Sequence, residues 1–261
     1  MRGKFFSWAG LLLGLLLGLS AACQPSLDER IEGLFGRERA GELTLEDLAG
    51  ALQDPAPQLR VTAVALMGRL GDVQALPLLE RAAEDEDAGV RATAAAAMGV
   101  LEDARAVPAL NQLIHDPVLV VRIKAAEALG EIGSKEGAKA LIWAVGQPQR
   151  KLREKAAIAL ERIAAPESVD ALIGLLDDDS PVVRAWAARA LGVIGDPRAR
   201  SALERMAARD NRYDRGAASS ALAVLDGAAD SATKNEPAGP IPAGGRSEGG
   251  RMTSPGKPET P

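Results

Sequence analysis

Apolar residues in the middle of the chain recur with helical spacing, and the whole pattern returns every 31 residues. Six copies align on an arginine without insertion or deletion, at Arg60, Arg91, Arg122, Arg153, Arg184 and Arg215. In every copy Ala stands three residues after this arginine, Leu or Met seven residues after it, and Leu or Ile ten residues after it. Positions 3, 7 and 10 lie on one face of a helix. The pattern therefore predicts a helix that begins near each arginine and buries this face.

A second helix is predicted in each copy. Leucine recurs nineteen residues after the arginine, at Leu79, Leu110, Leu141, Leu172 and Leu203, and Leu48 falls in the same register before the first copy. Thr44 and Asp47 have the spacing of a capping box at the start of that earlier helix. A constant period of this size is typical of stacked two-helix units. We therefore predict an all-α protein, an α-solenoid of about six repeats over residues 44–228, with helices of about ten to twelve residues.

The segments on either side of the repeats differ from them in composition. Residues 229–261 contain six Pro and six Gly and almost no large apolar residue. Such a segment buries too little surface to offset its chain entropy, so a disordered tail is expected there. Residues 23–43 form a linker in which 27–37 is expected to be a short capping helix. The sixth copy, with Gly216, Ser219 and Ser220, is interpreted as a terminal cap of the solenoid.

Residues 1–22 have the three-part pattern of a secretory signal: a basic start, an uncharged apolar run over 5–19, and small residues before Cys23. The Cys directly after these small residues makes the segment resemble a bacterial lipoprotein signal, although Ser20 stands where that family usually has Leu. The resemblance implies lipidation of Cys23. Ordinary cleavage after Ala22 and an uncleaved membrane anchor are the alternatives. All three place the folded part outside the cytoplasm, and Gln24 resembles the sorting signal for the outer membrane in diderm bacteria.

Composition narrows the classes of function. Removal of residues 1–22 changes the formal net charge from −5 to −7, because Arg2 and Lys4 are the charged residues of that segment. A mildly acidic protein has no general electrostatic attraction to nucleic acid, so a nucleic-acid partner is not expected. The chain has one Cys and one His, His115, so neither a disulfide, a metal site nor a cofactor is expected. An enzyme is not expected either.

The repeat resembles a known family. The pattern D-x-x-x-x-V/L-R-x-x-A-x-x-A-L-G is similar to short HEAT repeats of the type found in phycobilin lyase subunits. In that family an Asp six residues before the Arg forms a ladder with it between neighbouring repeats. Gln147 and Arg209 replace this Asp before Arg153 and Arg215. The resemblance implies a structural ladder of Asp54, Arg60, Asp85, Arg91, Asp116, Arg122, Arg153, Asp178 and Arg184.

In this repeat class the helix that starts at the Arg lines the concave side, so its outward positions, two, five and nine residues after the Arg, are expected to face a partner. Trp and Arg are enriched at binding hot spots. The candidate partner-binding patch is therefore Lys155, Ile158, Arg162, Trp186 and Arg189. The alternative is that Trp186 packs against the next helix. Trp143, on the other helix of its repeat, is a second exposed aromatic candidate.

These observations favour a membrane-anchored interaction scaffold of the bacterial cell envelope that binds an unknown protein or peptide partner through its concave face. The resemblance to phycobilin lyase subunits leaves an accessory subunit of a related enzyme as the alternative, although an export signal argues against it. A structural spacer is a third interpretation. It predicts that surface substitutions have no effect beyond stability.

Overall fold

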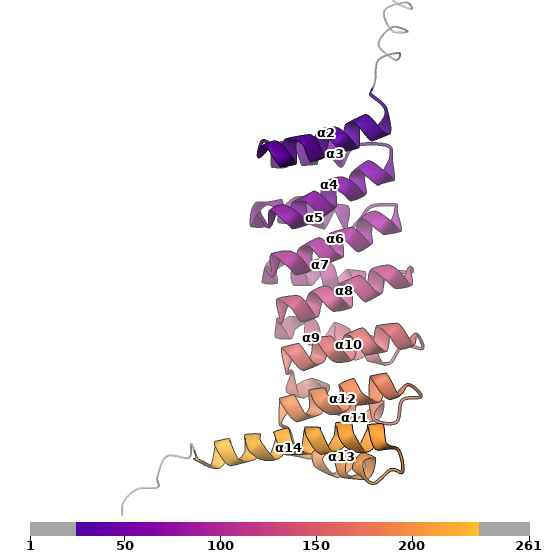
Figure 1. Cartoon of the computed structure of the whole chain (residues 1–261), viewed down its shortest axis with the longest axis vertical. Helices are drawn as coiled ribbons and strands as arrows, with labels where there is room; N and C mark the ends of the chain where they lie inside the picture. The colour runs from indigo at the N-terminus through magenta and orange to yellow at the C-terminus, as the bar shows by residue number, and fades with distance from the viewer. Residues whose placement is uncertain (1–24, 235–261) are drawn as a thin grey trace, which may run out of the picture.

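The computed structural model describes residues 25–234, and these residues form a single stack of α-helices in chain order with no strand among them (Figure 1). A first helix, α2 (Leu27–Ala40), is followed by six repeats, each a short helix and then a long one. The pairs are α3 (Leu45–Ala51) with α4 (Pro57–Leu70), α5 (Leu76–Ala82) with α6 (Ala88–Leu101), α7 (Val107–Leu113) with α8 (Leu119–Ile132), α9 (Ala138–Val145) with α10 (Arg150–Ile163), α11 (Val169–Leu175) with α12 (Pro181–Ile194), and α13 (Arg200–Ala207) with α14 (Arg212–Lys234). The predicted all-α solenoid is confirmed.

The two helices of a repeat are less equal than the sequence suggested. The long helices α4, α6, α8, α10 and α12 have 14 residues each, whereas the short ones have seven or eight. A three-residue 3₁₀ turn precedes each of α5, α7, α9, α11 and α13 and takes up part of the apolar pattern. At Asp72, Asp103 and Asp196 the side chain caps this turn by accepting a backbone N–H two residues later. The expectation of about ten to twelve residues for each helix is therefore wrong, because the long helices exceed it and the short α-helices fall below it.

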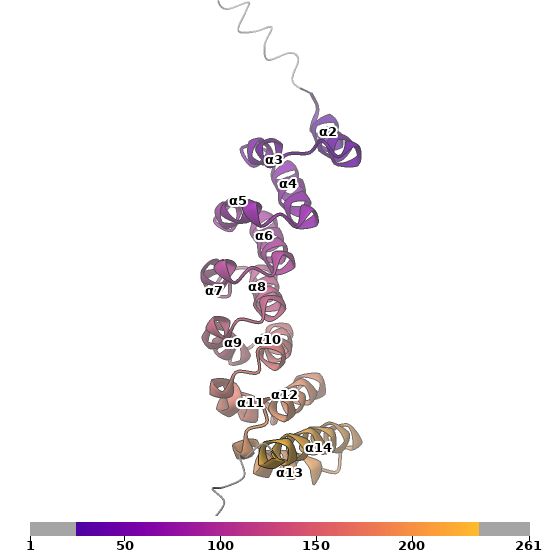
Figure 2. The same ribbon diagram turned by 90° about the vertical axis from the view of Figure 1, so that its left-hand side faces the viewer.

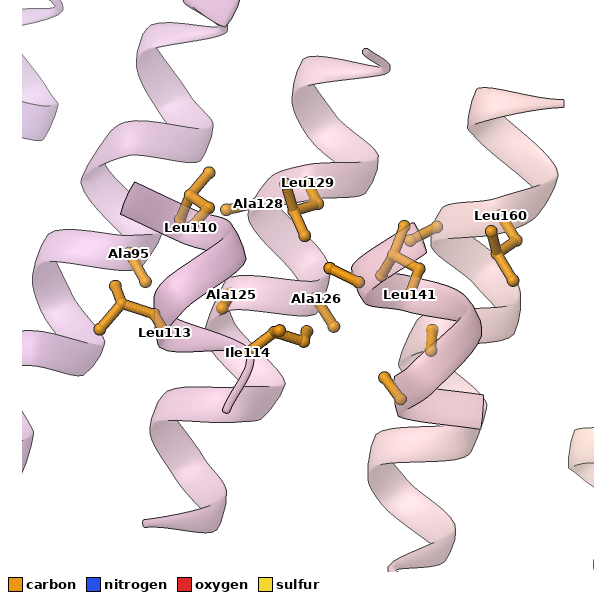
Figure 3. Close-up of a cluster of buried hydrophobic side chains, with 14 of the residues drawn as sticks. Ala95, Leu110, Leu113, Ile114, Ala125, Ala126, Ala128, Leu129, Leu141 and Leu160 are labelled. Carbon is orange, nitrogen blue, oxygen red and sulfur yellow. The ribbon is translucent and has the colours of Figure 1, made fainter. Parts of the chain in front are cut away.

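The core lies between the two helix layers and is built mainly from Ala and Leu (Figure 3). The Ala three residues after each repeat arginine is fully buried in all six copies, and so is each Leu nineteen residues after it. The tenth position is buried at Leu101, Ile163 and Leu225, as predicted, but Leu70 is 42% exposed and Ile132 and Ile194 are half-buried. The last three end their helices next to a left-handed C-cap glycine.

The stack is curved, with the long helices along its concave side and the short helices along its convex side (Figure 2). Close approach of successive long helices depends on a Gly eight residues after the repeat arginine. A Cβ on Gly130 would lie 2.8 Å from both Cα and Cβ of Ala159, and one on Gly68 would lie 3.0 Å from Cβ of Ala97. The contact of this Gly with an Ala of the next long helix therefore sets the spacing between successive long helices.

Both ends of the stack are extended by helix. The segment 27–37, expected to cap the N-terminal end, lies within α2, which buries Leu34 and starts at a capping box of Ser26 and Glu29. The predicted capping box of Thr44 and Asp47 is confirmed. At the other end α14 continues to Lys234, so residues 229–234, expected in the tail, are helical.

The signal segment, Cys23 and residues 235–261 lie outside the described residues. Within 25–234 no helix is long and apolar enough to cross a membrane.

Candidate functional site

The concave strip is defined as the side chains two, five and nine residues after each repeat arginine. On α4 it consists of Thr62, Ala65 and Arg69, and on α6 of Thr93, Ala96 and Val100. On α8 it carries Lys124, Glu127 and Glu131, on α10 Lys155, Ile158 and Arg162, on α12 Trp186, Arg189 and Val193, and on α14 Ala217, Ser220 and Val224. Each of these side chains is exposed or half-buried. The strip is therefore a continuous accessible surface along the concave side.

The predicted patch lies on two adjacent helices of this strip, α10 and α12, and two of its cations already have partners. Lys155 Nζ lies 2.7 Å from Glu127 Oε1, and Arg189 Nε donates to Glu161 Oε1 at 2.7 Å. Arg162 is exposed, and no ion pair involves it among the described residues. Ile158 is half-buried between these charges. The patch thus combines one unpaired cation with two paired ones around an apolar centre.

Trp186 makes two kinds of contact. It is half-buried and packs against the core, as the packing alternative requires. Its ring also supports Arg189, whose guanidinium carbon lies 5.2 Å from the ring centroid, within the range of a cation–π contact. Trp186 therefore orders an exposed arginine on the concave strip while contributing to packing.

Two apolar hollows lie along the strip between neighbouring long helices. The larger, about 510 Å³, lies between α12 and α14 and is lined by Ala185, Arg189, Val193, Ala217, Ser220, Ala221 and Val224. The smaller, about 250 Å³, lies between α4 and α6 beside Arg69 and Val100. Small side chains at the strip positions open both hollows. The sequence interpretation missed the larger one because the sixth copy was treated only as a cap.

The middle of the strip is charged rather than hollow. Glu127 accepts from Lys124 Nζ at 2.9 Å as well as pairing with Lys155, so one carboxylate joins two repeats. Glu131 lies over Gly99, where a Cβ would come within 2.1 Å of Glu131 Oε2. Burial at this place raises the pKa of Glu131, and the attraction of Arg162 only partly opposes that rise.

The Arg–Asp ladder joins the repeats at the turns between short and long helices. Arg60 Nε and Nη2 donate to the two carboxylate oxygens of Asp85 at 2.8 and 2.7 Å, while Nη1 donates to the backbone oxygens of Asp54 and Pro55. Arg91 with Asp116 and Arg153 with Asp178 repeat this geometry. Each arginine therefore binds the turn of its own repeat and the Asp of the next one, which fixes the register of the stack.

The ladder carboxylates also hold the turns in which they lie. Asp85 Oδ1 accepts the backbone N–H of Asp87 at 2.8 Å. In the same way Asp116 accepts the N–H of Val118, and Asp178 accepts the N–H of Ser180. Burial alone would raise the pKa of Asp85, but the hydrogen bonds from Arg60 and the Asp87 N–H and the attraction of Arg60 and Arg91 outweigh it. The pKa of Asp85 is therefore below its ordinary value, as are those of Asp116 and Asp178 for the same reasons.

Three rungs differ from the pattern that the resemblance implied. Asp54 pairs with Arg30 of α2, which sequence reasoning missed because Arg30 lies outside the 31-residue register. Arg184 pairs with Asp214 of α14, since Arg209 stands at the usual Asp position and itself contacts Asp214. Arg122 has no carboxylate partner among the described residues, because Gln147 occupies the next Asp position. The expectation that Arg122 is an ordinary rung is therefore wrong.

The described residues offer little reactive chemistry. No group of three or more His, Cys, Asp or Glu side chains within 25–234 could hold a metal ion. His115 contacts Trp143 edge to face on the convex side, with ring centroids 4.1 Å apart, and Trp143 is 38% exposed.

Comparison with known proteins identifies the repeats. A family model for HEAT repeats matches the overlapping segments 45–130, 78–144, 111–184 and 138–223, together well over half of the chain. The chain belongs to the HEAT-repeat family. A search of curated proteins gives no match.

Solved structures with similar folds include natural and designed repeat proteins. A chain of the complex of CpcE and CpcF of phycocyanin lyase from Nostoc sp. PCC7120 is 28% identical, with a TM-score of 0.53 over 74% of this chain and 81% of that one. A designed armadillo repeat protein is 20% identical, with a TM-score of 0.54 over 70% of this chain and 100% of the other. Another, in complex with the peptide (KR)4, is 19% identical, with a TM-score of 0.56 over 68% and 98% of the two chains. The designed proteins support the fold alone.

Proposed function

We propose that this HEAT-repeat protein is a lipid-anchored interaction scaffold of a bacterial cell envelope, which binds a protein partner through its concave strip. The observation that carries the binding part is the coincidence, on α10, α12 and α14, of the unpaired Arg162, the Trp186–Arg189 pair and the hollow of about 510 Å³. A hollow lined by apolar side chains beside an ordered arginine has the composition of an interface hot spot. No catalytic step is part of the proposal.

The anchoring part rests on the sequence of residues 1–23. A single acyl chain binds a membrane only marginally, whereas a multiply acylated N-terminus anchors a protein stably. Mass spectrometry of the N-terminal peptide should show acylation at Cys23, and Cys23→Ser should release the protein from the membrane fraction. An unmodified Cys23 in protein isolated from cells would disprove this part and leave the binding part untouched.

Site-specific photocrosslinking tests the binding part. A photoreactive amino acid at Ile158 or Val193 should give one specific adduct in native envelopes, and the same amino acid at Gln112, which is exposed on convex helix α7, should not. Trp186→Ala should abolish the adduct. Because Trp186 also packs against the core, Arg189→Glu is the second variant. The Arg189 side chain is 64% exposed but pairs with the largely buried Glu161, so a thermal melt of Arg189→Glu is the check that the fold is kept.

Equal adducts from both faces, or adducts unchanged by Arg189→Glu, would contradict a concave binding site. A purely structural spacer predicts no specific adduct at any position.

A second candidate function is that of an accessory subunit of a lyase-type enzyme, which the similarity to a chain of the CpcE–CpcF complex favours. Its test is direct. Purified protein should change the absorption spectrum of an open-chain tetrapyrrole if it binds such a pigment, and an unchanged spectrum would exclude this candidate.

A further inference from the structure

Among the described residues, the ladder lacks a carboxylate at the step between the third and fourth repeats, where Gln147 follows Arg122. We call this step the ladder gap. Elsewhere a carboxylate lies between two arginines: Asp116 accepts from Arg91 and is also attracted by Arg122, and Asp178 relates in the same way to Arg153 and Arg184. At the gap the neutral Gln147 stands between Arg122 and Arg153. Two guanidinium groups therefore flank a position that holds an anion in the neighbouring steps.

The Arg122 guanidinium is already oriented to receive a carboxylate. Its Nη1 donates to the backbone oxygens of Asp116 and Pro117 at 2.8 and 3.3 Å, as in the complete rungs. Its Nε, which in the other rungs donates to the Asp of the next repeat, is buried and has no acceptor among the described residues. A buried charged donor without a partner is costly, so this edge of Arg122 favours an anion, which can reach the covered Nε only when the neighbouring side chains move aside.

The side-chain amide of Gln147 does not bond to Arg122 Nε. Its Nε2 donates to the backbone oxygen of Trp143 at 3.2 Å, within its own repeat. At the same step the ring of Trp143 contacts the ring of His115 edge to face. Two repeats earlier the equivalent residues are Arg81 and Gln53, which form a hydrogen bond instead. An exposed aromatic surface therefore lies at the step whose ladder position lacks a carboxylate.

We propose that the Arg122 step is a second binding site, which takes the carboxylate of an Asp or Glu side chain from a protein partner and the adjoining apolar side chain against Trp143. Carboxylate rather than a larger anion is favoured because the other steps of this ladder seat a carboxylate on the same edge of the guanidinium. The site lies at the turns and is independent of the concave strip.

The first experiment asks whether the position accepts a carboxylate. Sodium formate replaces sodium chloride at constant ionic strength, and the Arg122 Nε resonance of ¹⁵N-labelled protein is followed by NMR. We expect it to shift in the wild type and to stop responding in Gln147→Asp, which fills the position from within the chain. Asp116→Ala is the converse variant: it removes both the carboxylate and its volume from the rung at Arg91, whose Nε resonance should then respond to formate.

No formate response in the wild type, or the same response in Gln147→Asp, would overturn the proposal, because ordered water would then satisfy Arg122. Variants that fail to fold are recognised by their amide spectra. In that case the wild-type titration decides the question alone.

The second experiment distinguishes a protein partner from a free carboxylate. The probe is a blocked five-residue peptide with one Asp between two leucines, and its control is the same peptide with Asn. The Asp peptide should shift both Arg122 Nε and the Trp143 indole resonance, and the Asn peptide neither. Equal shifts from the two peptides, or a response to formate alone, would overturn the assignment to a protein side chain. Crosslinking through the concave strip should persist in Gln147→Asp, so failure of either proposal can be recognised separately.

Discussion

At the scale of single residues, Arg60 of this HEAT-repeat protein shows how a complete rung of the ladder holds a buried arginine. The Arg60 side chain is only 7% exposed and makes four hydrogen bonds shorter than 3.3 Å. Hydrogen bonding to Asp85 raises the pKa of Arg60 more than burial lowers it. Such a pair contributes specificity of register, and removal of one partner leaves the other charge buried.

Asp85→Asn should therefore lower the free energy of unfolding by about 3 kcal/mol, because the Arg60 charge stays buried while its counter-charge is lost. The control is Asp170→Asn. The Asp170 side chain is 81% exposed and pairs with Arg198 at 3.2 Å, so its loss should cost less than about 0.5 kcal/mol. Urea denaturation of the two variants measures both values. Equal effects would mean that the ladder adds nothing beyond an exposed ion pair.

The ladder also predicts how stability depends on pH. The pKa values of Asp85, Asp116 and Asp178 are lower in the folded protein than in the unfolded chain. Their contribution is therefore fully present above the unfolded pKa, about pH 4, and is lost as the pH falls through the folded values. Thermal melts between pH 7 and 2 should show this loss below about pH 4. The triple Asn variant should lose less stability over that acid range than the wild type.

At the scale of helices, the spacing of the concave layer depends on Gly–Ala contacts rather than on large side chains. Gly68, Gly99, Gly130 and Gly192 stand at equivalent positions, and a Cβ on any of them would meet the next long helix at 3.0 Å or less. The fourth repeat has Glu161 there instead, and this carboxylate pairs with Arg189. The helix pair that carries the candidate patch is therefore the one without this Gly contact.

Gly130→Ala should destabilise the protein by about 1–3 kcal/mol, because its Cβ would lie 2.8 Å from the backbone of Ala159 and the helices would have to separate. Gly174→Ala, at an exposed position of α11 with nothing within 4 Å of the new Cβ, should instead stabilise by about 0.5–1 kcal/mol. Calorimetry of both variants checks the opposite signs. A stabilising Gly130→Ala would show that the layer can relax at no cost.

At the scale of the whole molecule, features that recur with the 31-residue period could be predicted from the sequence. Contacts that are present in a single repeat could not. The buried Ala and Leu positions, the six repeats and most ladder members follow from the period. Arg30 and Asp214 escaped prediction because their side chains reach ladder positions from outside the register. The hollow beside Val224 escaped because it depends on small side chains of two successive helices, which no single copy reveals.

The ladder gap should also divide the unfolding of the stack. Stability in repeat proteins is approximately a sum of repeat and nearest-neighbour terms. The step that lacks its ladder ion pair and keeps the Lys155–Glu127 pair of the concave strip is therefore a weaker coupling between two blocks. Asp85→Asn should increase hydrogen exchange mainly in the block that ends with α8. Asp178→Asn should increase it mainly in the block that begins with α9. Gln147→Asp, which completes the ladder, should spread either effect over both blocks and steepen the urea transition, because more surface then unfolds together. Hydrogen exchange measured by mass spectrometry on the three single variants and the two double variants tests this. Uniform exchange along the stack in Asp85→Asn alone would mean that Gly130 and the apolar core already couple the blocks fully.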